Sequence, residues 1–246
     1  IPCMQVLEYD RSFLAARILL DKINANMIIS GAFGLFEKKT VIAVGGYDNS
    51  TMGEDMELVV RLHEFSRMNR KPYKIHFAQD AICWSQTPEK LSELCKQRKR
   101  WQRGLFQCMW GHRKMLANPR YGAVGLLSYL YFLLYELLSP FIELLGVLTM
   151  VLSVVMDMLN VKFMLVFLAC YALYGILLTL TAYFSRIYTI DQKLSFRELI
   201  LAIVACFFET TFLRFSLAFV RATAFVGYKK NKLNWGKLER KKMNKI

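Results

Sequence analysis

Phe163 to Ser185 is a run of 23 residues without a charged side chain, and it restricts the possible folds more than any other segment. A helix of this length is long enough to cross a hydrocarbon core about 30 Å thick. The whole chain is 55% apolar yet carries a formal charge of +14. Soluble domains rarely combine these two properties, whereas membrane proteins with a basic cytoplasmic surface often do. The sequence therefore predicts an integral membrane protein.

A second apolar stretch, Leu126 to Met156, is longer and contains Glu136, Pro140 and Glu143. Proline inside a helix removes a backbone hydrogen bond and bends the helix. We therefore expect the first half to lie at the membrane interface and the part from Leu137 to Met156 to cross. The two glutamates share one helix face, so they could line a polar passage, point towards the interface or pair with arginines.

A third stretch, Leu199 to Val226, is an imperfect span. It is interrupted by three charged residues, Glu209, Arg214 and Arg221. Lys and Arg outnumber the acids by nine to two in residues 89–120 and by eight to one in 228–246. Basic segments stay on the cytoplasmic side, and three full spans would separate these two blocks. We therefore expect two spans and a third segment that is re-entrant or interfacial.

The positive charge could serve nucleic acid, anionic lipid or a phosphorylated substrate. Because the basic blocks adjoin long apolar stretches, lipid and substrate are favoured and no nucleic-acid partner is expected. The six cysteines form no CxxC pair, which is typical of reduced thiols rather than of a disulfide framework or a zinc site. The chain begins with Ile1-Pro2 instead of Met, so we expect a fragment of a longer protein.

The first 120 residues mix short apolar and amphipathic segments, a pattern that predicts an α/β domain. Met27 to Phe36 is an apolar run broken by small residues, and Tyr73 to Ala78 alternates polar and apolar residues, so both are expected to be strands. Asp55 to Met68 carries apolar residues at helical spacing and predicts an amphipathic helix. A longer helix is expected from Pro88 to Leu116, with Thr87 as its N-cap.

Gly53-Glu54-Asp55 lies at the predicted start of the first of these helices. The glycine permits a tight turn, and a helix N-terminus stabilises an ionised carboxylate by roughly 0.3–1 kcal/mol. An ionised acid held on a rigid element is a candidate general base. The alternative is that both acids only cap the helix.

Gln97-Arg98-Lys99-Arg100-Trp101 lies on the longer predicted helix. Gln97 shares a helix face with Arg100 and Trp101. Arginine offers a planar set of donors for phosphate, glutamine a neutral amide, and tryptophan a flat ring on which a sugar can stack. The motif could therefore hold a diphosphate and a sugar, or it could lie on anionic headgroups with Trp101 as an interfacial anchor.

The order of these two motifs, followed by transmembrane helices, resembles glycosyltransferase family 2. Within that family the chain is similar to the membrane-integrated cellulose, hyaluronan, chitin and poly-N-acetylglucosamine synthases. Ser30-Gly31-Ala32-Phe33 resembles the strand that lines the acceptor site, and Gly45-Gly46-Tyr47 resembles the turn before the acidic motif. Trp84 to Pro88 is similar to the segment before the QxxRW helix, although Gln86 stands where an acid is often found. Trp235 to Arg240 is similar to a cytoplasmic tail of bacterial members.

The resemblance implies a nucleotide-sugar domain of the GT-A type, N-terminally truncated, in residues 1–120 with an interfacial helix. It further implies an α-helical transmembrane bundle in 121–227 and a basic cytoplasmic tail in 228–246. Such enzymes bind a divalent metal, Mg or Mn, with a DxD motif. No aspartate in this sequence has another aspartate two residues away, so the metal and the donor-binding half are expected upstream of this chain.

The resemblance also assigns roles to the site residues. Asp55 would be the general base, with Glu54 and Gly53 shaping its surroundings. The nucleoside diphosphate would be bound by Gln97, Arg98 and Arg100, and the acceptor sugar by Trp101 together with Ser30 and Gly31. His63, His76 and His112 have no ligand spacing and are expected to be structural. The tyrosines and phenylalanine between Tyr129 and Tyr135 favour an interfacial aromatic belt over a sugar track.

The implied reaction is inverting transfer of a hexose or N-acetylhexosamine from a nucleoside diphosphate sugar. The acceptor would be a growing envelope polysaccharide or a glycolipid, and the site would face the cytoplasm at a bacterial plasma membrane. Two other functions remain open: non-processive transfer of one sugar to a lipid acceptor, and a non-enzymatic membrane transporter or scaffold.

Overall fold

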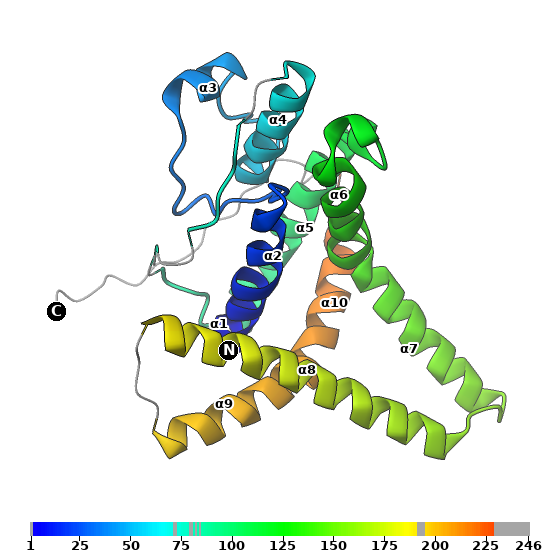
Figure 1. Ribbon diagram of the computed structural model, residues 1–246. Coiled ribbons are helices and arrows are strands. Elements are labelled where there is room, and N and C mark those ends of the chain that lie inside the picture. Colours follow the sequence, from blue (N-terminus) through cyan, green and yellow to red (C-terminus); the bar gives the residue numbers. More distant parts are fainter. Residues whose placement is uncertain are drawn as a thin grey trace.

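The computed structural model describes residues 2–70, 73–78, 81, 83, 85–190 and 195–228, and throughout this part every regular element is a helix (Figure 1). The first helix, α1 (Pro2–Arg11), continues through the π-helix η1 (Ser12–Arg17) into α2 (Ile18–Lys22). A short helix, α3 (Lys38–Ala43), follows after an irregular loop. Trp84 and the tail segment Trp235 to Arg240 lie outside the described residues.

The predicted α/β, GT-A-like domain is wrong for the described residues, because none of them forms a strand. Residues 27–36 and 73–78, the two expected strands, are irregular. In residues 73–78, two backbone amides donate to side chains at the end of α2 instead of to a neighbouring strand. Asn24 Oδ1 accepts from the Ile75 amide at 3.0 Å, and Asp21 Oδ1 accepts from the Phe77 amide at 2.7 Å. Alternating hydrophobicity predicts an extended backbone but not a partner strand.

The two motif-bearing helices are present as predicted, but their ends differ, and the longer one ends at Gly111 instead of the predicted Leu116. Helix α4 (Glu54–Met68) begins one residue before the predicted start. Helix α5 (Leu91–Gly111) begins three residues after the expected Pro88, and its N-cap is Lys90 rather than Thr87. Pro88 is held outside the helix, since its carbonyl accepts from Gln5 Nε2 on α1 at 2.8 Å. A core of apolar residues, including Met27, Met56 and Met109, joins these helices to the segment that follows.

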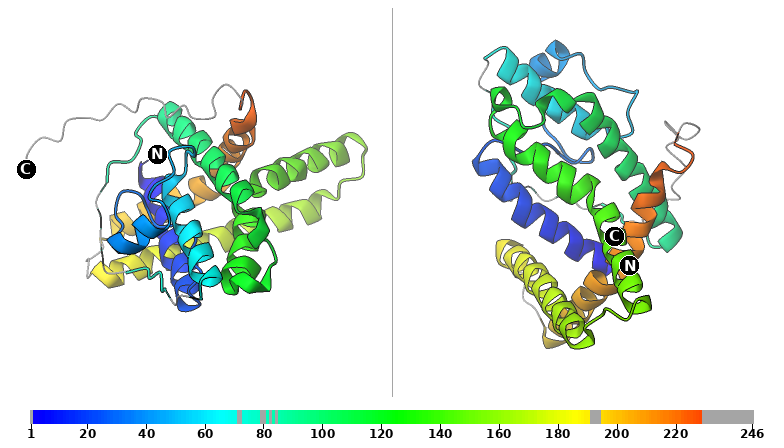
Figure 2. Two further views of the ribbon diagram at one scale, coloured as in Figure 1. Left: turned by 90° about the horizontal axis from the view of Figure 1, so that it is seen from above. Right: turned by 90° about the vertical axis from the view of Figure 1, so that its right-hand side faces the viewer.

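The second half of the chain consists of longer, mostly apolar helices. After the short helices η2 (Arg113–Met115) and η3 (Pro119–Tyr121), a helical segment runs through η4 (Val124–Ser128), α6 (Tyr129–Tyr131) and η5 (Phe132–Leu137). It is followed by α7 (Ser139–Val155), α8 (Val161–Ile190) and α9 (Phe196–Phe208). The last elements are η6 (Glu209–Leu213), α10 (Arg214–Ala222) and η7 (Thr223–Phe225). The end of α7 and the beginning of α8 project away from α1–α5 (Figure 2), whereas the later part of α8 lies against α1.

One described helix is long and apolar enough to cross a membrane, namely Val161–Ser185 within α8, and only 6% of an 18-residue apolar stretch of it is buried inside the protein. Val124–Leu137 and Ser139–Val155 meet the same criterion together, with a 47° bend between them. The bend falls next to Pro140, the residue expected to cause it. The segment from Phe196 to Ala222 is divided by a π-helix at Glu209–Leu213 and does not meet the criterion.

Ion pairs tie these apolar helices together. Arg214 on α10 donates to Glu143 on α7, with Nη2 and Oε1 3.0 Å apart. Arg221 Nη2 lies 3.5 Å from Glu136 Oε2. Both glutamates therefore face arginines from the last helical segment, which is one of the arrangements that their sequence positions left open.

Candidate active site

The turn that carries Tyr47 is fastened to the side of α4. Gly45 and Gly46 adopt positive φ angles of 92° and 75°, which glycine reaches without strain. Arg61 on α4 donates to the carbonyls of Val44 and Gly46 at 2.6 and 2.7 Å. This contact, which the sequence did not indicate, brings residues 45–49 alongside the start of α4.

Asp55 lies in the first turn of α4 and accepts two backbone hydrogen bonds. Its Oδ2 accepts from the Gly31 amide at 3.0 Å, and its Oδ1 accepts from the Met56 amide at 2.8 Å. Ser30 and Phe33 close the turn that presents Gly31, through a bond from Phe33 N to Ser30 O of 3.0 Å. A Cβ at residue 31 would lie 3.2 Å from Asp55 Oδ2. Glycine at this position therefore allows the turn to approach the carboxylate closely.

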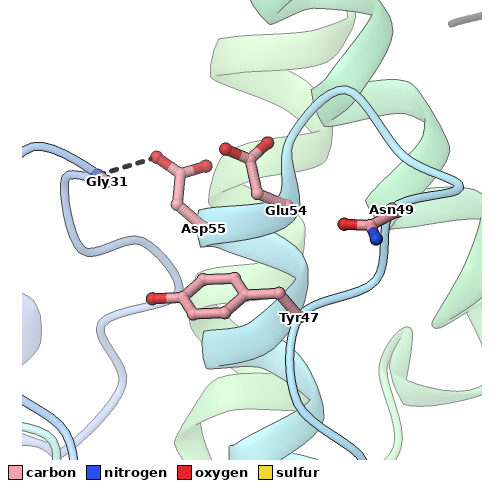
Figure 3. A pocket seen from close by; sticks show the side chains of 5 residues that line it. All are labelled: Gly31, Tyr47, Asn49, Glu54 and Asp55. Atoms are coloured by element: carbon pink, nitrogen blue, oxygen red, sulfur yellow. Dashed lines mark hydrogen bonds between the residues drawn. The ribbon is translucent and has the colours of Figure 1, made fainter.

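An open hollow of about 520 Å³ surrounds this carboxylate. It is lined by Gly31, Tyr47, Asn49, Glu54 and Asp55. Figure 3 shows the two carboxylates side by side, with the ring of Tyr47 beside them. Burial raises the pKa of Glu54 and the charge of Asp55 adds to this rise, whereas the backbone amide at the helix start and Arg100 oppose it. The hollow combines two acids, an amide and an exposed aromatic ring, groups that suit a polyhydroxylated ligand.

The acidic motif packs directly on α5. A Cβ at Gly53 would lie 3.2 Å from Gly104 Cα, and a Cβ at Gly104 would lie 2.8 Å from Gly53 N. Gln107, one turn further along α5, accepts from the Met52 amide at 2.8 Å and from Thr51 Oγ1 at 3.3 Å. No sequence motif indicated a role for Gly104 or Gln107 in the site. A glycine inside a helix lowers helix stability by about 1 kcal/mol relative to alanine, so its presence indicates close packing at that position. Gly104 inside the predicted helix could have been recognised in this way.

The face of α5 that contacts Gly53 also carries Gln97 and Arg100 of the QxxRW motif. Gln97, Arg100 and Gly104 recur at helical spacing of three and four residues, and Arg100 lies close enough to Glu54 to lower its pKa. Gln97 has a buried Oε1 without a hydrogen-bond partner among the described residues. The structure thus brings together Gly31, Gly53, Glu54, Asp55 and Arg100 from segments far apart in the sequence.

Arg98 and Trp101 lie towards α1. Arg98 Nη1 and Nη2 donate to Glu8 Oε1 and Oε2 at 2.9 and 2.7 Å. The Arg98 guanidinium lies 4.6 Å from the centroid of the Trp101 ring, and the Tyr9 ring lies 6.4 Å from it. Trp101 remains 40% exposed. A guanidinium with both terminal nitrogens bonded to a carboxylate is already engaged within the protein.

The described residues do not fit a metal ion. No three His, Cys, Asp or Glu side chains in this part of the chain come together as metal ligands, and Glu54 and Asp55 supply only two carboxylates. Among the histidines, His63 is buried, with Nε2 2.8 Å from the Asn26 carbonyl. His112 bonds to Glu57 and Glu64. His76 lies 3.4 Å from Asp21 Oδ2. All three take part in contacts within the fold.

Comparisons with known proteins agree with the motif-based resemblance. Over 90 residues the chain is 37% identical to the poly-beta-1,6-N-acetyl-D-glucosamine synthase of Staphylococcus aureus (strain COL). It is 36% identical over 90 residues to the synthase of the same name from Staphylococcus epidermidis. Each match covers 37% of this chain and 19% of the relative, so the chain matches about a fifth of the length of these relatives. No solved structure matches the chain.

The family comparison extends much further along the chain. Residues 4–219 match the family described as Glycosyl transferase family group 2, a range that includes both sequence motifs, the hollow around Asp55 and most of the apolar helices. The resemblance inferred from the motifs is thereby confirmed, and the chain belongs to glycosyltransferase family 2.

Proposed function

We propose that the protein containing this chain transfers a sugar from a nucleoside diphosphate sugar to an acceptor hydroxyl, with inversion at the anomeric carbon. The observation that carries the proposal is the position of Asp55. Its carboxylate is fixed by the Gly31 amide at 3.0 Å on the rim of an open hollow, and the same helix turn packs on the helix that carries Arg100.

Asp55 would act as the general base that takes the proton from the acceptor hydroxyl. A base is effective when it is held within hydrogen-bond reach of that proton, and the two backbone amides restrict this carboxylate to one orientation. Glu54 lies beside it with a raised pKa. Glu54 and Gly53 would shape the surroundings of the base, and Ser30 and Gly31 would form the opposite rim.

Gln97 and Arg100 would bind the departing nucleoside diphosphate. Departure of a diphosphate develops negative charge, and fixed cationic donors stabilise such charge best where water is limited. Gln97 would contribute its side-chain NH2 group as a donor, because its Oε1, which is buried without a partner among the described residues, can only accept hydrogen bonds. Trp101, 40% exposed, would meet the acceptor sugar with its ring. Alignment of donor and acceptor by these groups would supply much of the rate enhancement.

The acceptor would be a growing envelope polysaccharide, and the donor sugar a hexose or an N-acetylhexosamine. The relatives named as poly-beta-1,6-N-acetyl-D-glucosamine synthases support N-acetylglucosamine as the first donor to test. In this proposal residues 1–120 bind the substrates and 121–227 hold the protein in a bacterial plasma membrane. The tail 228–246 lies on the cytoplasmic side, as its basic residues indicate. The exposed apolar surface of α8 supports the membrane location.

The experiment uses membranes that contain the natural full-length protein and radiolabelled uridine diphosphate N-acetylglucosamine. Incorporation into a polymer supports the proposal in full. Addition of a single sugar to lipid supports transfer but contradicts polymer synthesis. The panel is extended to other nucleoside diphosphate hexoses. No incorporation from any of them, with the protein present in the membrane at normal amount, would contradict glycosyl transfer and favour a transporter or scaffold.

A further inference from the structure

Arg98 and Arg100 point to different sides of α5, although only one residue separates them. Residues two apart on a helix do not face each other. Arg100 lies on the side of Glu54, and Arg98 lies on the side of α1, where it is 7% exposed. One diphosphate bound at the Arg100 face would therefore not reach Arg98 directly.

The contact between Arg98 and Glu8 has the geometry of a specific pair. Two parallel bonds of 2.9 and 2.7 Å join the guanidinium to the carboxylate, the bidentate arrangement that fixes both groups in one plane. The side chains of Arg98 and Glu8 are only 8% and 25% exposed. Withdrawing Arg98 to bind a substrate would leave the Glu8 carboxylate largely buried without this partner, which is strongly unfavourable.

The same guanidinium also lies against Trp101. Its Cζ is 4.6 Å from the centroid of the Trp101 ring, within the range in which a cation is attracted to an aromatic face. Tyr9, next to Glu8 on α1, has its ring 6.4 Å from the Trp101 ring. Two adjacent residues of α1 thus limit the orientation of a tryptophan that is still 40% exposed.

We propose that Glu8 and Arg98 are positioning residues that hold the Trp101 ring in the orientation that receives the acceptor sugar, and that Arg98 does not bind the diphosphate. This inference rests on the proposed function, in which Trp101 meets the acceptor. It replaces the role for Arg98 implied by the family resemblance. It also gives α1 a part in the site, because α1 supplies the carboxylate that fixes Arg98.

The test measures KM separately for donor and acceptor in the natural full-length protein, with uridine diphosphate N-acetylglucosamine and a short N-acetylglucosamine oligosaccharide. Glu8→Gln and Arg98→Gln should each raise the acceptor KM by about tenfold and change the donor KM by less than about twofold. Because the two residues act as one unit, the double variant should be no worse than the poorer single variant. Arg113→Gln is the matched control. Arg113 lies 5.3 Å from the ring centroid of Trp110, a tryptophan that is on α5 as Trp101 is. This control should leave both KM values unchanged.

Opposite results would overturn the inference. If Arg98 binds the diphosphate, Arg98→Gln raises the donor KM. Glu8→Gln then releases Arg98, so the donor KM falls or stays unchanged, and the acceptor KM stays unchanged. Should the pair variants fail to accumulate in the membrane, Arg98→Lys serves instead, because lysine keeps the positive charge beside Glu8 but cannot form the two parallel bonds or the planar stack on Trp101. An unchanged acceptor KM in Arg98→Lys then contradicts the inference.

Failure of this inference can be separated from failure of the proposed function by Asp55→Asn in the same assay. Loss of transfer in Asp55→Asn together with a donor-only effect of Glu8→Gln contradicts the positioning role and leaves glycosyl transfer intact. Full transfer by Asp55→Asn contradicts the proposed function itself.

Discussion

Gly53 and Gly104 lie against each other backbone to backbone, so that a Cβ at Gly104 would come within 2.8 Å of the Gly53 nitrogen. This contact joins the acidic motif at the start of α4 to the helix of the QxxRW motif. Since the obstructing atoms are backbone, they cannot move aside as the end of a flexible side chain would. The relative position of Asp55 and Arg100 thus depends on two positions without a Cβ.

Gly104→Ala is expected to separate the two motifs. Overpacking of this kind costs about 1–3 kcal/mol, and a displacement of about 1 Å at a reacting group can lower the rate by about a hundredfold. We expect kcat to fall by about tenfold or more, as measured by sugar incorporation at saturating donor and acceptor.

Gly111→Ala is the matched control, because nothing lies within 4 Å of a Cβ at Gly111 and this residue is also on α5. The control should leave kcat unchanged and the free energy of unfolding unchanged or raised by up to about 1 kcal/mol. Equal kcat values for Gly104→Ala and the wild type would show that the glycine contact does not position the site.

His112 should make the stability of the α4–α5 pair depend on pH. Burial on its own would lower the pKa of His112, but hydrogen bonds to Glu57 and Glu64 outweigh burial and raise it. The stabilisation is therefore complete below the pKa of an unfolded histidine, about 6.5, and is lost as the pH rises through the higher pKa of the folded state. The free energy of unfolding should therefore fall as the pH rises above about 6.5.

His112→Gln should remove this part of the pH dependence, and Glu64→Gln should weaken it, because Glu64 Oε2 lies 2.7 Å from His112 Nδ1. The measurement is chemical unfolding in detergent at a series of pH values. A slope that stays the same in His112→Gln would mean that other groups cause it.

Arg11 and Glu209 should stabilise the contact between α1 and the last helical segment mainly as a pair. Arg11 Nη1 also donates to Thr179 Oγ1 on α8 at 3.0 Å, and the Glu209 side chain is 5% exposed. Glu209→Leu leaves Arg11 without its carboxylate and should lower the free energy of unfolding by about 3 kcal/mol. The double variant Arg11→Met, Glu209→Leu should recover most of this loss, since it leaves no unpaired charge. Additive losses in the double variant would contradict this interpretation.

The helices of the site could be predicted from the sequence, and the irregular segments around them could not. Residues 55–68 carry enough apolar side chains at helical spacing to identify α4. Residues 73–78 alternate as a strand does, but their amides bond to Asn24 and Asp21. An alternating pattern indicates an extended backbone whose side chains point to two opposite faces. The backbone amides of such a segment can donate to side chains distant in the sequence as well as to a second strand.

The candidate site was partly predictable for a similar reason. Asp55 and the QxxRW residues were predicted from their types and order, and Gly31 from the family resemblance; the structure places the Gly31 amide 3.0 Å from Asp55 Oδ2. The partners that arrange them were missed. Glu8 is separated from Arg98 by 90 positions and Gln107 from Met52 by 55, and single glutamates and glutamines give no local pattern that would indicate such contacts.

The proposed function depends most directly on Asp55 as the general base. The decisive measurement compares sugar incorporation by the wild type, Asp55→Asn and Asp157→Asn in the natural full-length protein at equal membrane amounts. Asp157 is exposed, with a φ of 53° in the turn after α7, where asparagine is well accommodated. We predict that Asp55→Asn loses on the order of 10²-fold or more of the transfer rate and that Asp157→Asn retains it. Wild-type transfer by Asp55→Asn would contradict the assignment of the base and, with it, the account of this site.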